Sequence, residues 1–393
     1  MRNIYLDNAA TTKISNEVLR EMLPTYENVF GNSSSLHCFG REANKLVDTA
    51  RDRIAKAIGA NSNEVYFTSG GTEADNWALI GLALANKSKG DHIITSAIEH
   101  HCILDTCKKL EGMGFRVSYL PVDKDGLVSI TDLIHEIDER TILVSIMTAN
   151  NEVGTIQNIQ TIAKIAHEKH AIFHTDAVQA IGAINIDVKK LDIDAMSMSS
   201  HKIHGPKGAG ALYVKKGIKI NPLIVGGNQE RGKRGGTLNV PGVVGFGKAI
   251  ELATRDLSIN VKKVKMIREY FTARVLKEIE DIKINGHSVQ RLPSIVNISF
   301  NYIEGESLLL LMDLDGIAVS TGSACSSGSL ETSHVLKAMG LPSEIAQGSI
   351  RFSFGTEITK DEVDYVVDCL VKNVKKLRQM SPLNKKSPRG GTK

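Results

Sequence analysis

The sequence predicts an α/β protein, with a large domain built on a mostly parallel sheet covered by helices on both faces and a smaller C-terminal α/β domain. Two observations predict this class. Short apolar segments typical of buried strands alternate with longer segments whose apolar residues recur at helical spacing. The chain also has 393 residues, more than a single hydrophobic core usually spans, so we expect two domains.

The composition excludes several classes of partner. The formal charge of +4 is small beside 48 basic and 44 acidic residues, and it indicates neither a nucleic-acid nor a membrane-surface partner. The N-terminus lacks the apolar stretch of a signal peptide, and no apolar run is long enough to cross a bilayer. We therefore expect a soluble cytoplasmic protein.

The five cysteines do not form an even, closely spaced framework, which indicates a reducing compartment and free thiols; they are Cys38, Cys102, Cys107, Cys325 and Cys369. Cys102, Cys107 and Cys369 lie on helical patterns, where we expect inert, buried thiols.

The first part of the chain contains two helical patterns before the first strand. Asn16 is the expected cap of a helix over residues 17–23, and residues 31–35 predict a loop. Apolar residues at helical spacing over residues 46–58 predict the second helix, and residues 64–68 predict a strand.

A glycine turn follows this strand and opens a helix that begins near Gly71 and Thr72. Backbone N–H groups at a helix N-terminus have no partner within the helix, and the helix dipole favours an anion there. Gly71 and Thr72 are therefore candidate phosphate ligands, although many glycine turns open helices without binding anything.

The central part alternates strands and helices, with strands predicted over residues 92–95, 117–120, 142–146 and 171–173 and a helix from residue 101 to about 110. Ligands bind at the carboxyl ends of the strands in such sheets. His100, Asn151 and Asp176 follow strands and are candidate site residues. Zinc binding by His100, His101, Cys102 and Cys107 is the weaker interpretation, because three of the four are consecutive and no second Cys/His pair follows.

Lys202 follows a strand of small and apolar residues over 194–199 and precedes a glycine-rich turn. A lysine at such a junction can be partly desolvated, which lowers its pKa and frees the amine to form a Schiff base. Asp176 lies 26 residues upstream, enough for one helical connection and the next strand. Pyridoxal phosphate needs such a lysine together with a carboxylate for its ring nitrogen.

These residues carry a resemblance to a known family. Asp176-Ala177-Val178-Gln179 followed by Ser199-Ser200-His201-Lys202 resembles the cofactor site of the class V, fold-type I pyridoxal-phosphate enzymes. The chain from about residue 5 to residue 383 is similar to cysteine desulfurases of the NifS/IscS group. The resemblance implies a fold-type I transferase that binds pyridoxal 5'-phosphate through Lys202.

The resemblance also implies roles for other residues. His100 is expected to stack on the cofactor ring, Asn151 and Gln179 to bind its substituents, and Ser199 and His201 to complete the cofactor site. Residues 226–237 form a glycine-rich basic loop that would cross the interface of a homodimer, so that Thr237 contacts the neighbouring phosphate. Gly235 stands where the family often has a serine.

Cys325 lies among small residues, mostly serine and glycine, over 320–329. Such a segment favours an exposed, mobile thiol, and it is similar to the catalytic loop of the NifS/IscS group. Arg351 lies in a predicted strand over 349–354, and the resemblance implies that its planar fork binds the substrate carboxylate together with Asn151.

We expect four segments: residues 1–15 packing with the small domain, a large cofactor-binding domain over 16–260, a small domain over 261–380, and a disordered tail over 381–393. The tail does not match the extended C-terminus by which some family members dock their scaffold partner, so the resemblance does not extend to this contact.

The expected activity is that of a cysteine desulfurase. L-cysteine gives L-alanine and a persulfide on Cys325, with Lys202 and His100 moving protons, and the sulfur passes to a NifU/IscU-like iron–sulfur scaffold or another acceptor. Three alternatives remain open, namely a selenocysteine lyase, a fold-type I aminotransferase that has no use for Cys325, and a sulfur carrier without a cofactor.

Overall fold

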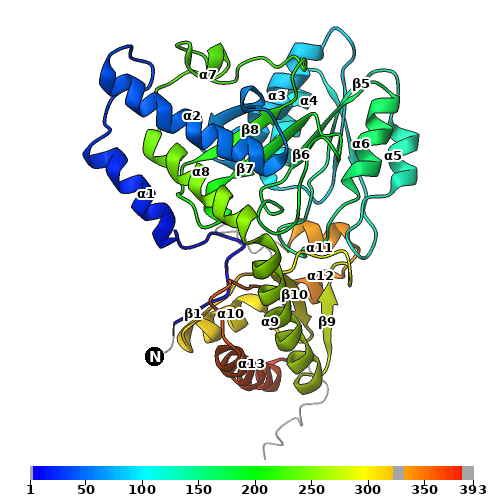
Figure 1. Ribbon diagram of the computed structural model, residues 1–393. Coiled ribbons are helices and arrows are strands. Elements are labelled where there is room, and N and C mark those ends of the chain that lie inside the picture. Colours follow the sequence, from blue (N-terminus) through cyan, green and yellow to red (C-terminus); the bar gives the residue numbers. More distant parts are fainter. Residues whose placement is uncertain (1–2, 322–331, 383–393) are drawn as a thin grey trace, which may run out of the picture.

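The computed structural model describes residues 3–321 and 332–382, and a seven-stranded sheet forms its centre (Figure 1). The strands run in the order β2-β8-β7-β6-β5-β3-β4. Their bounds are β2 (Val65–Thr68), β3 (His92–Ser96), β4 (Arg116–Leu120), β5 (Thr141–Ser145), β6 (Ile172–Asp176), β7 (Ala195–Ser199) and β8 (Gly210–Val214).

Most of this sheet is parallel, as predicted. Strands β4, β3, β5, β6 and β7 pair in parallel, whereas β8 is antiparallel to both β7 and β2. Strand β8 reverses direction because only a short turn around Gly205 and Gly208 joins it to β7, whereas the parallel neighbours are joined by longer crossovers.

Helices cover both faces of the sheet, which also confirms the prediction. Successive strand residues face opposite sides, so Phe173 packs in one core cluster and Ile172 in another. The first face is covered by α2 (Cys38–Ile58), α5 (Ile130–Glu136), α6 (Ile159–Glu168) and α8 (Val240–Arg255), and the second by α3 (Gly71–Asn86) and α4 (His101–Gly112).

The first helix, α1 (Asn16–Glu27), begins and ends differently from the expectation. Asn16 was expected to cap it, but Ser15 is the cap: its backbone is extended and its hydroxyl accepts a hydrogen bond from the Val18 amide. Asn16 already has a helical position. The helix also continues through Pro24, four residues beyond its expected end at residue 23.

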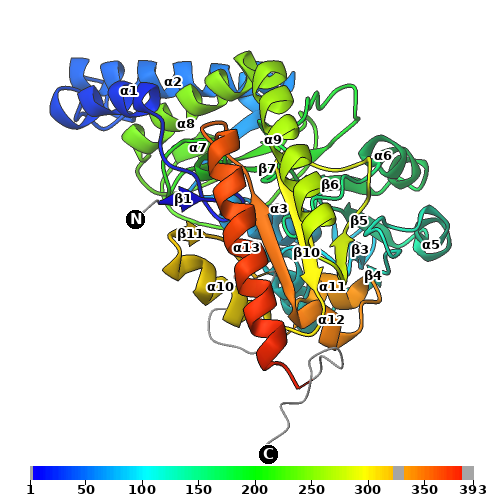
Figure 2. The ribbon, with the colours of Figure 1, turned by 90° about the horizontal axis from the view of Figure 1, so that it is seen from below.

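The C-terminal part builds a second, antiparallel sheet, with β10 (Ile295–Phe300) between β9 (Ile282–Asn285) and β12 (Ser349–Ser353). Its core contains Phe271, Phe352 and Phe354. Figure 2 shows α9 (Leu257–Glu278) and α13 (Lys360–Met380) running beside this sheet. The remaining helices are α7 (Gln229–Gly232), α10 (Gly305–Leu314), α11 (His334–Ala338) and α12 (Ser343–Gln347), with 3-10 turns η1 (Ser62–Glu64) and η2 (Ser200–Lys202).

The N-terminal segment joins the two sheets. Strand β1 (Ile4–Tyr5) forms a two-stranded parallel sheet with β11 (Ile317–Ala318). The Leu6 carbonyl accepts a hydrogen bond from the Ser353 amide of β12 at 2.7 Å, and the Thr12 amide donates to the His201 carbonyl, just after β7, at 2.9 Å. Helices α8 and α9 meet at Asp256, close to the expected boundary at residue 260. The division into domains at these positions remains a prediction. Among the residues described, no helix is both long and apolar enough to cross a membrane.

Candidate active site

The predicted lysine and carboxylate come together at the carboxyl ends of neighbouring strands. Asp176 is the last residue of β6, and Lys202 lies in η2, directly after β7. These two strands pair in parallel, with Asp176 opposite Ser197. His100 precedes α4, and Gly71 begins α3, so four elements converge at this edge of the sheet, where ligands bind in α/β folds.

The Asp176 side chain is buried, and one of its oxygens accepts a hydrogen bond from the Val178 amide at 2.8 Å. Burial raises the pKa of Asp176 to about 6, and the Val178 amide and the positive charge of Lys202 oppose this rise. A cationic group beside Asp176 would stabilise the ionised form further.

The N-terminal segment covers Lys202. The Lys202 amine donates hydrogen bonds to the carbonyl oxygens of Ala9 at 2.6 Å and Ala10 at 2.8 Å. The Gln179 side-chain amide donates to the same Ala9 carbonyl at 2.9 Å. The segment therefore connects two of the predicted site residues, a contact of its carbonyl groups that no local pattern indicated.

The start of α3 packs closely against Val178 and Ser199, at the ends of β6 and β7. A Cβ added at Gly71 would lie 2.7 Å from the Cγ2 atom of Val178 and 3.6 Å from the Cβ atom of Ser199. The Ser199 hydroxyl is buried without a hydrogen-bond partner among the residues described. Glycine thus lets the backbone of α3 approach a hydroxyl that can still donate to an anion. Thr72 follows as the second residue of the helix.

His100 caps α4, with its Nδ1 atom accepting a hydrogen bond from the Cys102 amide at 3.3 Å. Burial, and then the charge of Lys202, lowers the pKa of His100 to about 4. The imidazole is therefore neutral near pH 7 and able to accept a proton. Another neutral ring is His201, whose pKa is lowered to about 4 by burial and whose Nδ1 atom lies 3.2 Å from the Thr11 hydroxyl.

Arg351 lies on β12 and is almost completely buried. Its two terminal nitrogens donate to the Asp7 carboxylate at 2.8 Å and to the Asn151 carbonyl at 3.0 Å, while Nε is buried without a partner among the described residues. Sequence reasoning paired Arg351 with a substrate carboxylate but missed Asp7, which already occupies one side of the guanidinium. A substrate carboxylate would share or replace that contact.

Two predicted site residues are not brought into this cluster. Thr237 is exposed on the glycine-rich loop, and Cys325 lies outside the described residues. The loop itself is held to α3, because the Arg234 guanidinium donates to the Glu73 carboxylate at 2.8 and 3.0 Å.

The sequence was compared with known protein families, and the class-V aminotransferase family matches residues 4–366. The chain belongs to the class-V aminotransferase family. Within it, the chain is 52% identical over 392 residues to cysteine desulfurase IscS of Dictyoglomus turgidum, covering 98% of this chain and 100% of that protein. It is 54% identical over 386 residues to cysteine desulfurase IscS of Methanosarcina thermophila, covering 98% and 95%.

Solved structures of this class-V family agree with the fold. A NifS-like protein superposes with a TM-score of 0.91 at 41% identity, over 96% of this chain and 100% of that chain. The apo cysteine desulfurase of Thermococcus onnurineus gives a TM-score of 0.85 at 25% identity, over 95% of each chain. The predictions of a fold-type I α/β protein and of a pyridoxal-phosphate-dependent cysteine desulfurase of the NifS/IscS group are confirmed.

The residues of this class-V enzyme fit pyridoxal phosphate. The unpartnered Ser199 hydroxyl and the amides that open α3 are donors for its phosphate, the buried Asp176 carboxylate suits a cationic ring nitrogen, and the Lys202 amine suits its aldehyde.

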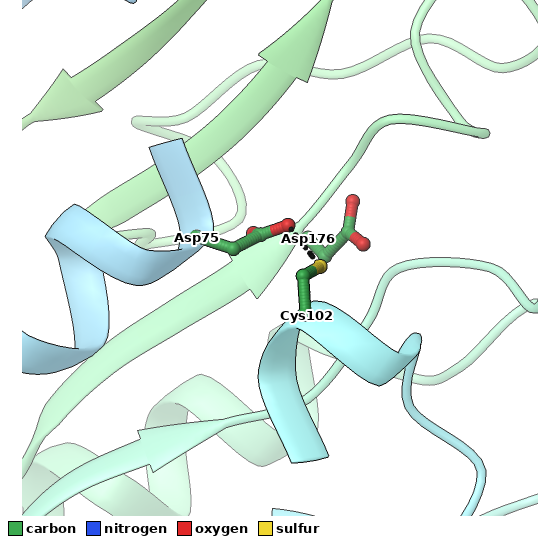
Figure 3. A group of neighbouring side chains, drawn as sticks. All are labelled: Asp75, Cys102 and Asp176. Carbon is green, nitrogen blue, oxygen red and sulfur yellow. Dashed lines mark hydrogen bonds between the residues drawn. The ribbon is translucent and has the colours of Figure 1, made fainter. Parts of the chain in front are cut away.

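Two side chains near Asp176 were missed by sequence reasoning. Figure 3 shows Asp75 of α3 and Cys102 of α4 beside Asp176, and one ligand atom from each of the three lies within 4.8 Å of the others. Cys102 was expected to be an inert helical thiol, but it contacts two polar site residues. In the described part of the chain, His100, His101 and Cys107 do not belong to this group of neighbouring ligand atoms, so the four residues of the zinc interpretation do not come together. No local signal identified Asp75, because only tertiary packing brings α3 and α4 together here.

Proposed function

We propose that this cysteine desulfurase transfers the sulfur of L-cysteine to Cys325 with Lys202, His100 and Asp176 as its other reacting groups. The observation that supports this most strongly is the buried Asp176 carboxyl, which interacts electrostatically with Lys202 across neighbouring strand ends. A carrier protein without a cofactor has no need to bury a carboxyl group beside a lysine at the strand ends.

Pyridoxal phosphate, when bound, supplies an electron sink that allows bonds at the substrate α- and β-carbons to break. In the proposed roles Lys202 holds the cofactor, Gly71, Thr72, Ser199 and His201 bind its phosphate end, and Asn151 and Gln179 bind its ring substituents. Asp176 keeps the ring nitrogen protonated. Lys202, aided by His100, removes the α-proton of cysteine and returns a proton when alanine forms.

The proposed sulfur transfer is covalent catalysis by Cys325. Its thiolate attacks the sulfur of the substrate, an S–S bond forms and the substrate C–S bond breaks. Cysteine and the enzyme thiol thus become alanine and an enzyme persulfide, so no external oxidant or reductant is needed. Arg351 and Asn151 would hold the substrate carboxylate, because the guanidinium fork matches its geometry.

We also propose a homodimer in which Thr237 reaches the cofactor phosphate of the neighbouring subunit. Exposed apolar side chains support a second copy as partner. Phe30 is 73% exposed and stacks on Phe39, which is 49% exposed, while Leu36 is 89% exposed. Apolar side chains gathered in this way are typical of a protein interface.

The proposed sulfur acceptor is a NifU/IscU-like scaffold protein or another sulfur-accepting protein in the cytoplasm. Free thiols support a reducing compartment, because Cys38, Cys102, Cys107 and Cys369 are all unpaired.

The central experiment separates the cofactor from the thiol. The wild-type protein is expected to be coloured by bound pyridoxal phosphate, to release alanine from cysteine and to gain one sulfur atom at Cys325 by mass spectrometry. Cys325→Ser should keep the visible band and lose the persulfide, whereas Lys202→Ala should lose the covalent attachment. Cys369→Ala is the control, because Cys369 is a free thiol on α13 in the core of the C-terminal part and should be dispensable for the reaction.

Three results would contradict this proposal. A colourless protein after reconstitution would favour a carrier, and an amino-group transfer without alanine release would favour an aminotransferase. Undiminished persulfide formation in Cys325→Ser would remove Cys325 from its role. Competition between cysteine and selenocysteine distinguishes the desulfurase from a selenocysteine lyase.

A further inference from the structure

A second buried carboxyl group, that of Asp75, lies next to Asp176 and is not used by the mechanism above. Asp75 is only 1% exposed. Its Oδ2 atom is 3.0 Å from the Cys102 sulfur, whereas Oδ1 has no hydrogen-bond partner in the described structure and lies 3.8 Å from Nε2 of His174 (Figure 3). A fully charged carboxylate would be costly in this position, because the Cys102 thiol and the Ser197 hydroxyl beside it are neutral donors that supply no positive charge.

Ionising both Asp75 and Asp176 would cost electrostatic free energy. Their oxygens lie within 4.8 Å of one another in a buried site, and two like charges at this distance favour retention of one proton by the pair. Asp176 accepts an amide hydrogen bond and interacts with the Lys202 charge. The proton therefore belongs on Asp75.

The other groups around Asp75 support this assignment. Burial and then the Asp176 charge raise the pKa of Asp75 well above its usual value, the Cys102 thiol and the Ser197 hydroxyl oppose the rise, and Glu99 adds to it. His174 supplies no positive charge, because burial lowers its pKa to about 3.

A proton on Asp75 sets the direction of a hydrogen-bond chain. A charged Asp75 accepts a hydrogen bond from the Cys102 thiol at Oδ2. With the proton on Oδ2 this direction would reverse, so that the acid donates to the sulfur and the thiol hydrogen is free to point at Nδ1 of His100, 2.9 Å from the sulfur. Nδ1 also accepts from the Cys102 amide, so both contacts keep this nitrogen unprotonated and the ring proton on Nε2.

We propose that Asp75 is a positioning residue that keeps its proton and passes a hydrogen bond through the Cys102 thiol to His100, so that Asp176 carries the negative charge of the pair. This inference rests on the roles proposed above for Asp176 and His100. It assigns Cys102 a function in orienting His100, where the helical position alone indicated an inert thiol.

Infrared difference spectroscopy of the full-length protein tests where the proton lies. The spectrum of wild type minus Asp75→Asn at pH 7 should show loss of a carboxylic-acid C=O band and no loss of a carboxylate band. Glu99→Gln serves as the reference for another buried acid. Loss of a carboxylate band in Asp75→Asn would overturn the proposal.

The visible absorbance of the bound cofactor gives an independent test of the charge on Asp75. Asparagine replaces a neutral acid by a neutral amide, so the pH midpoint of the visible absorbance should be the same in Asp75→Asn and wild type. Removing a charge this close to Asp176, the proposed partner of the ring nitrogen, would instead shift the midpoint by about 1 unit or more. Such a shift would overturn the inference. If wild type binds no cofactor, the proposed function fails, but the infrared result on the cofactor-free chain still decides the state of Asp75.

The S–H stretching band tests the direction of the chain even if Asp75→Asn does not fold. This band is identified by its loss in Cys102→Ala, and its low frequency should rise in His100→Phe because the acceptor is removed. An S–H band that does not respond to His100→Phe would show that the thiol donates elsewhere and would overturn the proposed chain.

Discussion

Glu99, on the loop before α4, shows how burial controls single residues around this site. Its carboxyl group is fully buried and accepts hydrogen bonds from the Ser96 hydroxyl at 2.6 Å and the Met147 amide at 2.9 Å. Burial raises its pKa from 4.5 to about 8, so Glu99 is mostly protonated at pH 7. The same cause keeps His100 neutral and raises the pKa of Asp75.

The raised pKa of Glu99 predicts a pH-dependent stability. Because the folded pKa of about 8 exceeds the unfolded value near 4.5, this contribution is complete below pH 4.5 and is lost as the pH rises towards 8. Relative to Glu99→Gln, the wild-type free energy of unfolding should fall by up to ~1.4 kcal/mol per pH unit in this window. Urea unfolding of both proteins from pH 4.5 to 9 measures this difference in the free energy of unfolding. Parallel pH profiles for the two proteins would contradict a protonated Glu99.

Arg351 offers a second prediction for a single residue. Arg351→Lys keeps the positive charge but loses the planar fork that bonds Asp7 and Asn151, so kcat/KM for cysteine should fall by about 10- to 100-fold. Steady-state kinetics measure this loss, and circular dichroism checks that the buried variant is folded. Arg140→Lys is the control, because the Arg140–Asp91 pair is on the surface. Equal effects in the two variants would refute a substrate role for Arg351.

The glycine-rich loop is anchored to the start of α3, the helix that opens the proposed phosphate site. Glu73 accepts hydrogen bonds from the Ser69 amide and from Arg234, which ties the loop to the helix. Four residues before Arg234 in the same loop, the buried Glu230 carboxylate pairs with the Arg51 guanidinium of α2 at 2.7 and 2.8 Å. The loop is therefore anchored to α2 and α3 by charge pairs that its sequence did not indicate.

The tight approach at Gly71 predicts a selective loss of cofactor affinity. In Gly71→Ala the new Cβ would meet Val178 at 2.7 Å, so the start of α3 must shift and its amides move away from the phosphate. The Kd for pyridoxal phosphate should rise about tenfold or more, equivalent to ~1.4 kcal/mol. Gly112→Ala is the matched control, because nothing lies within 4 Å of its added Cβ. Unchanged binding in Gly71→Ala would argue against a phosphate site here.

At the scale of the whole molecule, the N-terminal segment connects the second sheet to the lysine. Ile4 and Leu6 pack in the core of the C-terminal part, and Asp7 pairs with Arg351. A few residues later, the carbonyls of Ala9 and Ala10 bind Lys202. The segment thus spans both halves of the site, and damage to its anchor should affect the cofactor as well as stability.

Leu6→Ala tests this connection. Leu6 is 1% exposed, and its truncation should destabilise the protein by about 2–5 kcal/mol through lost apolar burial and a cavity. It should also weaken retention of pyridoxal phosphate, because Ala9 and Ala10 are held less firmly. Urea unfolding and gel-filtration retention of the cofactor measure the two effects. Leu314→Ala, at a 73% exposed position, should change neither. If Leu6→Ala lost stability but retained the cofactor, the packing of Leu6 would not be needed to hold the cofactor, and the proposed connection would be wrong.

Much of the fold could be predicted because its signals are local. The strands of the large sheet were recognisable as short apolar runs, and the boundaries differ by only a few residues, as for β5 (Thr141–Ser145), which was expected over residues 142–146. The cap of α1 was wrong because Ser15 and Asn16 are both capable caps, and only the backbone conformation distinguishes them.

The sequence by itself determined the fold class, the family and the two reacting groups on adjacent strands, because Asp176 and Lys202 each follow a recognisable strand and stand in a recognisable motif. Only the tertiary structure decided which distant groups surround them. The Arg351–Asp7 pair joins residues 344 positions apart, and Cys102 meets Asp75 across 27 positions through the packing of two helices. Local patterns report periodicity and turns, whereas these contacts depend on how the elements pack.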